Sequence, residues 1–180
     1  MAEAMTTKPA PLDSMGALQA LHHPDTGRNK VLLVDDCPST RIFMRHALGQ
    51  ALPGLEIIEA KHPVEAIQML SADGVADSIA FALSDKDMPK MSGIELAAVI
   101  SGQEIGGRSL HPDHVTAMKS VPKLMMTGTY DEELAKRLVA DGLFHHVGKK
   151  GAGGLGEVFE NIRIAIERAA ISKGEEEAIQ

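Results

Sequence analysis

The sequence predicts an α/β protein built on a doubly wound parallel β-sheet. Five short apolar segments alternate with segments whose apolar residues recur at helical spacing, as in strands joined by crossover helices. Aromatic residues make up only 3% of the chain, which agrees with aliphatic strands that helices cover on both faces. The 180 residues are enough for one domain with a buried core.

The predicted strands are short and mostly continuous in their apolar character. They are residues 30–34, 55–60, 78–83, 122–127 and 143–147. Pro38 and Pro63 suit the first turn of the two helices that follow the first two strands, where the missing proline N–H costs no hydrogen bond. A third helix is expected after Gly93. Thr129 and Glu132 have capping-box spacing before a fourth helix, and a fifth begins near residue 155.

The regular pattern defines the expected domain boundaries. Residues 1–29, rich in proline and turn residues, are expected to form a mobile N-terminal extension. The domain is expected to span residues 30–171. Within it, residues 101–120 form a long connection that contains glycines and shows only weak periodicity. Residues 172–180 are expected to be a charged C-terminal tail.

Composition excludes several classes of function. The net charge of −7 argues against direct nucleic-acid binding. The single cysteine rules out an internal disulfide framework and suits a reducing compartment. No apolar run is long enough to span a membrane, and the first residues do not resemble a signal peptide. We therefore expect a cytoplasmic protein.

Polar side chains follow four of the five predicted strands. Asp35 and Asp36 follow the first, Asp85 the third, Thr127 the fourth and Lys149 the fifth. In a doubly wound sheet, ligands bind outside the carboxyl ends of the strands, where the strand order switches. We therefore expect these side chains to converge on one site.

The residue types in this group are suited to phosphoryl transfer. Three neighbouring carboxylates repel one another, and a hard divalent cation such as Mg²⁺ relieves that repulsion through oxygen ligands. One carboxylate can then attack phosphorus and form an aspartyl phosphate. A lysine ammonium neutralises phosphate charge, and a threonine hydroxyl donates a hydrogen bond to a phosphoryl oxygen.

Four segments resemble the receiver domain of two-component response regulators. They are "VLLVDD", "SDKDMPKMSGIEL", "MMTG" and "HHVGKK", and the resemblance covers about residues 30–170. The motif Asp-x-x-Met-Pro-x-x-x-Gly matches at Asp85, Met88, Pro89 and Gly93. The resemblance implies a flavodoxin-like, five-stranded parallel sheet of order 2-1-3-4-5. Because one helix and a tail remain after residue 153, it also suggests a stand-alone, chemotaxis-type receiver.

The resemblance implies a role for each acidic residue. Asp85 would be the phosphoacceptor and a ligand of Mg²⁺. Asp36 would bind Mg²⁺ directly, and Asp35 through water. Asp87 would offer its backbone carbonyl to the metal.

The resemblance also implies a switch. Thr127 would be the switch hydroxyl, Lys149 the phosphate-binding cation, and His146 would occupy the position where the family usually has a rotating aromatic residue. The chain departs from the family at Lys150, where proline is usual. We therefore expect a trans 149–150 peptide bond and a mobile loop over residues 150–156.

Together these features predict a phosphorylation-dependent signalling switch. A sensor histidine kinase or phosphotransfer protein would phosphorylate Asp85, and a downstream target would bind the face formed by the fourth helix, fifth strand and fifth helix. Self-phosphorylation and slow autodephosphorylation would be its only chemistry, so it would not be an enzyme. Two alternatives are a phosphohydrolase like the haloacid dehalogenases, for which the motif order is reversed, and a phosphorylation-independent scaffold.

Overall fold

The computed structural model describes residues 27–150 and 154–179, with side chains through residue 171. Most of residues 1–29, and residues 151–153 of the predicted 150–156 loop, lie outside these residues. Residues 154–156, which were also predicted to belong to the loop, form the start of the last helix. Among the described residues no peptide bond is cis, so the expectation of a trans 149–150 bond is confirmed. No described helix is both long and apolar enough to cross a membrane.

The core of the fold is one parallel sheet of five strands. The strand order is β2-β1-β3-β4-β5, and every neighbouring pair is parallel, as the sequence predicted. The strands are β1 (Lys30–Val34), β2 (Glu56–Ala60), β3 (Ile79–Asp85), β4 (Lys123–Thr127) and β5 (His146–Lys149).

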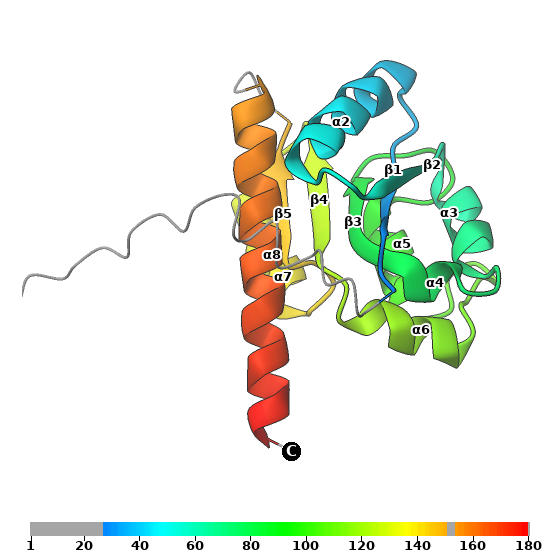
Figure 1. The fold of residues 1–180 in the computed structure, drawn as a ribbon. Helices are drawn as coiled ribbons and strands as arrows, with labels where there is room; N and C mark the ends of the chain where they lie inside the picture. The colour runs from blue at the N-terminus through cyan, green and yellow to red at the C-terminus, as the bar shows by residue number, and fades with distance from the viewer. Residues whose placement is uncertain (1–26, 151–153, 180) are drawn as a thin grey trace, which may run out of the picture.

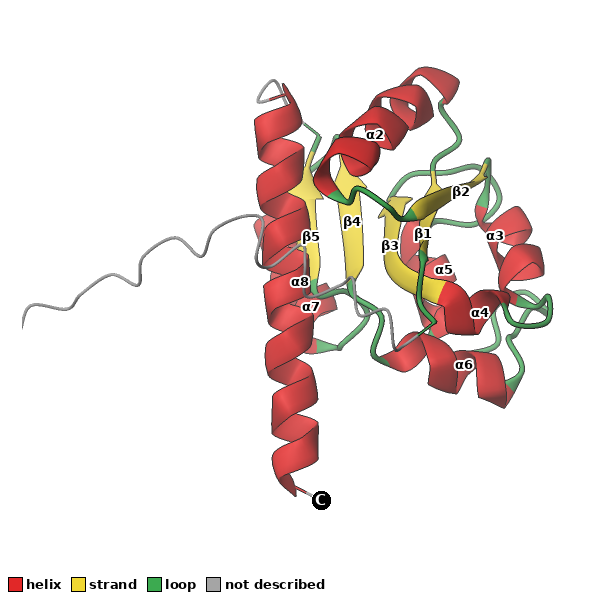
Figure 2. Cartoon of the chain, in the orientation of Figure 1, coloured by secondary structure: helices red, strands yellow, loops and turns green. Residues whose placement is uncertain are grey.

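Helices cover both faces of this sheet (Figures 1 and 2). They are α2 (Pro38–Ala51), α3 (Pro63–Leu70), α4 (Val75–Ser78), α5 (Gly93–Ile100), α6 (Pro112–Lys119), α7 (Glu132–Ala140) and α8 (Gly154–Ile179). Side chains of α2 and α8 pack on one face, and those of α3, α5 and α7 pack on the other. The sheet is therefore the middle layer of three.

Alternate residues of each central strand divide the core between the two faces. In β1, Val31 and Leu33 pack with α2 and α8, whereas Leu32 and Val34 pack towards α3 and α5. All four are at most 1% exposed, because a parallel strand covered on both sides has no solvent face. The alternation, together with the register of the strands, also fixes which side chains face the sheet edge that carries the acidic residues.

The 101–120 segment contains a helix that its weak periodicity did not predict. Helix α6 is held from outside its own sequence. Arg28 donates to the carbonyls of Ile79 and Ala117 at 2.6 Å each, and Lys123 Nζ donates to the Met118 carbonyl at 3.3 Å. Cations at the last carbonyls of a helix satisfy groups that have no partner within the helix. Tertiary contacts, more than local pattern, stabilise α6.

Several predicted boundaries shift in the structure, and the largest shifts concern β5 and α8. Strand β5 begins at His146, three residues later than predicted, because Leu143 and Phe144 close the end of α7 with backbone hydrogen bonds to the Leu138 carbonyl. The backbone of α8 is helical to residue 179, so residues 172–179 continue this helix. In addition, α7 is capped by the Asp131 side chain and not by Thr129.

Lys123 allows a test of the fold. Its side chain is buried at 5% exposure, and burial lowers the pKa of its ammonium group to about 8. The unfolded chain, with an ordinary pKa near 10.5, therefore binds this proton more tightly. The cost of the buried charge is fully present below pH 8 and disappears as the pH rises towards 10.5. The free energy of unfolding should rise over this window, by up to about 1.4 kcal/mol per pH unit.

Urea unfolding at pH 7.5 to 10.5 measures this effect as the difference between wild type and Lys123→Met. The difference should change in favour of wild type as the pH rises, because only wild type carries the titrating group. Lys61→Met, at an exposed position, is the control and should show no such trend. A wild-type advantage over Lys123→Met that stays constant with pH would contradict the assignment.

Candidate functional site

Three carboxylates meet at the carboxyl ends of β1 and β3. Asp35 directly follows β1 and Asp85 is the last residue of β3; one carboxylate oxygen from each, and one from Asp36, lie within 4.8 Å of one another. Asp35 is fully buried and Asp85 is 8% exposed, while Asp36 is exposed. The Cys37 N–H donates to Asp35 Oδ1 at 2.9 Å. The predicted convergence of the acidic residues is present in the structure.

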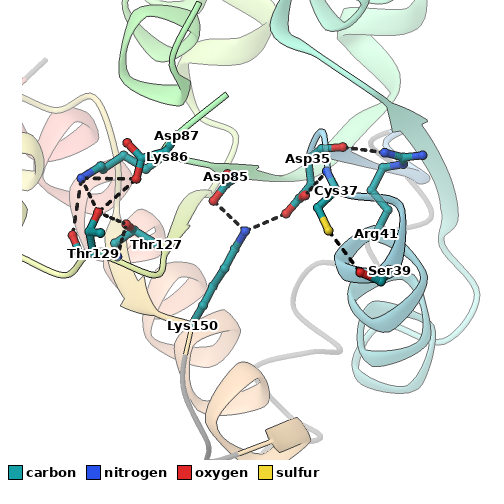
Figure 3. A network of polar contacts seen from close by, with 10 residues as sticks. All are labelled: Asp35, Cys37, Ser39, Arg41, Asp85, Lys86, Asp87, Thr127, Thr129 and Lys150. Atoms are coloured by element: carbon teal, nitrogen blue, oxygen red, sulfur yellow. Dashed lines mark hydrogen bonds and ion pairs between the residues drawn. The ribbon is translucent and has the colours of Figure 1, made fainter. Parts of the chain in front are cut away.

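Lys150 is the cation of this site (Figure 3). Its Nζ lies 2.8 Å from Asp35 Oδ2 and 2.6 Å from Asp85 Oδ1. Its backbone N–H donates to the Thr127 carbonyl at 2.7 Å. This hydrogen bond extends the pairing of β4 and β5 to Lys150. Burial opposes the charge on Lys150, but its hydrogen bonds to Asp35 and Asp85 together raise the pKa of the ammonium group.

The ionised form of Asp85 is disfavoured in spite of this ion pair. Burial raises the pKa of the Asp85 carboxyl, the bond to Lys150 opposes that rise, and the neighbouring Asp35 charge adds to it. Asp85 is therefore a carboxylate held in an environment that does not favour its ionised form. Such an arrangement is typical of functional sites, because a stability-optimised core would avoid it.

Lys149, which the sequence analysis assigned to this role, does not reach the carboxylates. It is exposed and lines a cavity of about 350 Å³ between the starts of α2 and α8. The physical reason is register. Side chains alternate along a strand, and β5 pairs Lys149 with Thr127, which places the next residue, Lys150, over the acidic cluster. Of the two lysines, the structure brings Lys150 to the carboxylates.

The side chain of His146 lies on the α8 side of the sheet. Its Nε2 lies 2.8 Å from Asn161 Oδ1 of α8, so its side chain faces the α8 side of the sheet. Val147 faces the other side and packs with Ala135 and Leu138 of α7. The residue of β5 that faces α7 is therefore Val147.

Thr127 lies where it was predicted, at the end of β4, and is 2% exposed. Its hydroxyl accepts a hydrogen bond from the Thr129 N–H at 3.1 Å, and Figure 3 shows it directed towards Thr129. The Thr129 hydroxyl donates to Asp87 Oδ2 at 3.0 Å and accepts from Lys86 Nζ at 2.9 Å. Sequence reasoning missed Lys86 and Thr129. The only available signal was their position, because Lys86 comes one residue after Asp85 and Thr129 two residues after Thr127.

The loop after β3 is shaped by its glycine. A Cβ on Gly93 would lie 2.0 Å from the carbonyl oxygen of Asp85, so no other residue fits without moving the end of β3. The Gly93 N–H donates to the Lys86 carbonyl at 2.9 Å, and Ser92 and Glu95 form a capping box at the start of α5. Lys90 has a φ of 71°, a strained value for a residue with a side chain. The Met-Pro…Gly motif thus folds the loop tightly against Asp85.

The residues of this site fit a magnesium ion. Mg²⁺ prefers oxygen ligands and usually takes one or two carboxylates together with waters. Asp36 and Asp85 present such carboxylates at an accessible edge, and the negative charge of the three acids exceeds the single positive charge of Lys150. The unbalanced charge and the all-oxygen donor set are what a hard divalent cation requires.

Comparison with known proteins agrees with the class that this fold and site define. Residues 31–155 match the family described as response regulator receiver domain. That span is more than half of the chain. The protein belongs to the response regulator receiver domain family.

Solved structures of the same fold extend across most of the chain. The adenylate cyclase from Rhodopirellula baltica superposes with a TM-score of 0.60 at 20% identity, covering 84% of this chain and 97% of that one. Chemotaxis response regulator CheY4 of Vibrio cholerae has a TM-score of 0.58 at 23% identity, covering 77% of this chain and 98% of that one. At such identities the likeness concerns the fold.

One curated relative is similar over a shorter stretch. Transcriptional activator protein ExaE of Pseudomonas putida is 37% identical over 65 residues. These residues are 36% of this chain and 28% of that protein, so the match spans less than a third of the relative's length.

The raised pKa of Asp85 leads to a prediction about stability. The folded protein binds a proton at Asp85 more tightly than the unfolded chain, whose pKa is near 3.8. The ionised carboxylate therefore costs stability above the folded pKa, and this cost disappears as the pH falls towards 3.8. Asp85→Asn should raise the free energy of unfolding at pH 7 by on the order of 1 kcal/mol, and the gain should shrink towards pH 4.

Chemical denaturation of both proteins from pH 4 to 7 measures this difference. Asp73→Asn, at an exposed turn position, is the matched control and should leave stability unchanged. Lower stability of Asp85→Asn at pH 7 would mean that the Lys150 ion pair outweighs burial.

Proposed function

We propose that this protein is a phosphorylation-dependent signalling switch that accepts a phosphoryl group on Asp85. Family membership supports the class of function, and the observation that supports this acceptor is the ion pair of Asp85 with Lys150 beside two further carboxylates. Asp85 is the carboxylate of the cluster that also sits on the tightly folded Met-Pro…Gly loop. The donor would be a histidine kinase or a phosphotransfer protein.

In the proposed reaction a carboxylate oxygen of Asp85 attacks the phosphorus of a phosphohistidine. A new P–O bond forms as the P–N bond breaks, and the imidazole leaves with the electron pair of that bond. Lys150 lies between the attacking carboxylate and Asp35, so its ammonium can move onto the phosphoryl oxygens as negative charge accumulates. Positioning and charge neutralisation are the main requirements of phosphoryl transfer.

We propose Mg²⁺ as the cofactor of this reaction. Asp36 and Asp85 would bind it through their carboxylates, Asp87 through its backbone carbonyl and Asp35 through water. When bound, the ion would neutralise charge on the phosphoryl oxygens. Asp36 suits direct contact because it is exposed, whereas the buried Asp35 is already occupied by Lys150 and the Cys37 N–H.

The output surface of the switch is proposed to be the face formed by α7, β5 and α8, to which a downstream target protein would bind. Thr127 stands at the start of the segment that leads into α7. Val147 of β5 packs against α7, and His146 contacts α8. Because Thr127 pairs with Lys149 of β5, a movement of Thr127 towards a phosphoryl group would act on the strand that contacts both helices.

Phosphorylation with a small donor tests the assignment of the acceptor. Incubation with Mg²⁺ and acetyl phosphate should add one phosphoryl group, which intact mass spectrometry detects and peptide mapping places on Asp85. Asp85→Asn should remove the label. Asp36→Ala should also abolish it, and adding Mg²⁺ should no longer have an effect. A label that persists in Asp85→Asn, or that maps to a histidine, would refute the proposal.

A pair of adjacent variants tests the choice of lysine. Lys150→Met should slow phosphorylation by acetyl phosphate by at least about 100-fold, since removing one charge-stabilising group at such a site typically costs two to three orders of magnitude. Lys149→Met should stay within about threefold of wild type, because its ammonium is exposed and away from the carboxylates. Initial rates by mass spectrometry measure both. The reverse ranking of the two variants would restore Lys149 to the role.

A further inference from the structure

Two loops at the mouth of the site are tied together through a single hydroxyl group. Lys86 and Asp87 lie on the loop after β3, and Thr129 lies on the loop after β4. Lys86 Nζ donates to Thr129 Oγ1 at 2.9 Å and approaches the Thr129 carbonyl at 3.4 Å. The same hydroxyl donates to Asp87 Oδ2 at 3.0 Å, and Lys86 Nζ is 3.6 Å from that carboxylate oxygen. We call this Lys86–Thr129–Asp87 cluster the latch.

The latch also engages the hydroxyl of Thr127. A threonine hydroxyl has one proton to donate, and Thr129 gives its own to Asp87. In the 3.4 Å contact between the two threonine hydroxyls, the proton must therefore come from Thr127. At the same time Thr127 Oγ1 accepts the Thr129 N–H. Both its donating and its accepting capacity are directed at Thr129, and among the described residues no hydrogen bond joins it to Asp85.

A phosphoryl group on Asp85 would compete with this arrangement. To donate to a phosphoryl oxygen, the Thr127 proton must leave Thr129, and the segment that carries Thr129 must allow the side chain to turn. The latch opposes this movement because it anchors Thr129 to a cation and a carboxylate on the opposite loop (Figure 3). The side chain of Lys86 is 17% exposed and that of Asp87 is 62% exposed, so the anchor depends on the geometry of its hydrogen bonds to Thr129 more than on the attraction between the two charges.

We propose that Lys86 and Thr129 are positioning residues that hold Thr127 in the resting state. This inference rests on the proposed function, since it assumes that Thr127 responds to a group on Asp85. The latch must then open before Thr127 can bind a phosphoryl group. The apparent affinity for that group is reduced in proportion to the fraction of molecules in which the latch is open. One net hydrogen bond changes such a fraction by about fivefold.

Matched substitutions separate the hydroxyl from the size of the side chain. Thr129→Val keeps the shape and removes the hydroxyl, whereas Thr129→Ser keeps the hydroxyl. Lys86→Met removes the ammonium, whereas Lys86→Arg keeps a cation. Because Thr129 is exposed, its two variants should fold as wild type does. Lys61→Met serves as a control for the loss of a lysine elsewhere.

Two measurements test the latch. Hydrogen–deuterium exchange of residues 128–131, without Mg²⁺ or a phosphoryl mimic, should be about fivefold faster in Thr129→Val and Lys86→Met than in wild type. With saturating Mg²⁺, the concentration of beryllofluoride at half-saturation should be about fivefold lower in the same two variants. Thr129→Ser and Lys86→Arg should restore wild-type values in both.

Each contrary outcome has a distinct meaning. Equal exchange in Thr129→Val and Thr129→Ser would overturn the latch, as would a higher half-saturating concentration in Thr129→Val, which would show that the hydroxyl assists the phosphate. If beryllofluoride bound no variant and not wild type, the proposed function would fail. The exchange of the unliganded proteins would then still decide whether the latch exists.

Discussion

The structure depends on a concentration of negative charge at one edge of the sheet. Asp35, Asp36 and Asp85 lie within reach of one ion, and a single ammonium, that of Lys150, compensates two of them. Removing Lys150 would leave both buried carboxylates without this compensation, which is costly. The tight loop that ends in Gly93 and the pairing that carries Lys150 past Thr127 both serve to hold this arrangement.

The same edge connects chemistry to the surface of the molecule. Strand β5 places Val147 towards α7 and His146 towards α8, so a displacement at its end is felt on both sides of the sheet. Thr127 lies one strand away and is bonded to a loop that leads into α7. In the proposed switch, a group on Asp85 would compete with Thr129 for the Thr127 hydroxyl, and this competition would give the loop two states.

The opposite edge of the sheet has a separate and structural use of charge. Arg28 and Lys123 satisfy carbonyls at the end of α6, and His145, whose pKa burial lowers to about 4, stays neutral beside Lys123. The buried ammonium group of Lys123 is satisfied by hydrogen bonds to the carbonyls of Met118, Lys119 and Val121. They attach the long connection between α5 and β4 to the core, away from the acidic cluster.

The sequence alone determined the class of fold, the acidic cluster, Asp85 with its Met-Pro…Gly loop, and the position of Thr127. These features follow from local signals, namely the apolar strand segments and the polar residues at their ends. The tertiary structure decided what depends on register and on distant partners. Leu143 and Phe144 are apolar enough for a strand but close α7. The pairing of β5 with β4 brings Lys150, and not Lys149, to the carboxylates, and Val147 faces α7. A change of one residue reverses the face of every side chain, and only the pairing of β5 with β4 settles it. Helix α6 and the latch lie beyond sequence reasoning for the same reason, since their stabilising contacts join residues far apart in the chain.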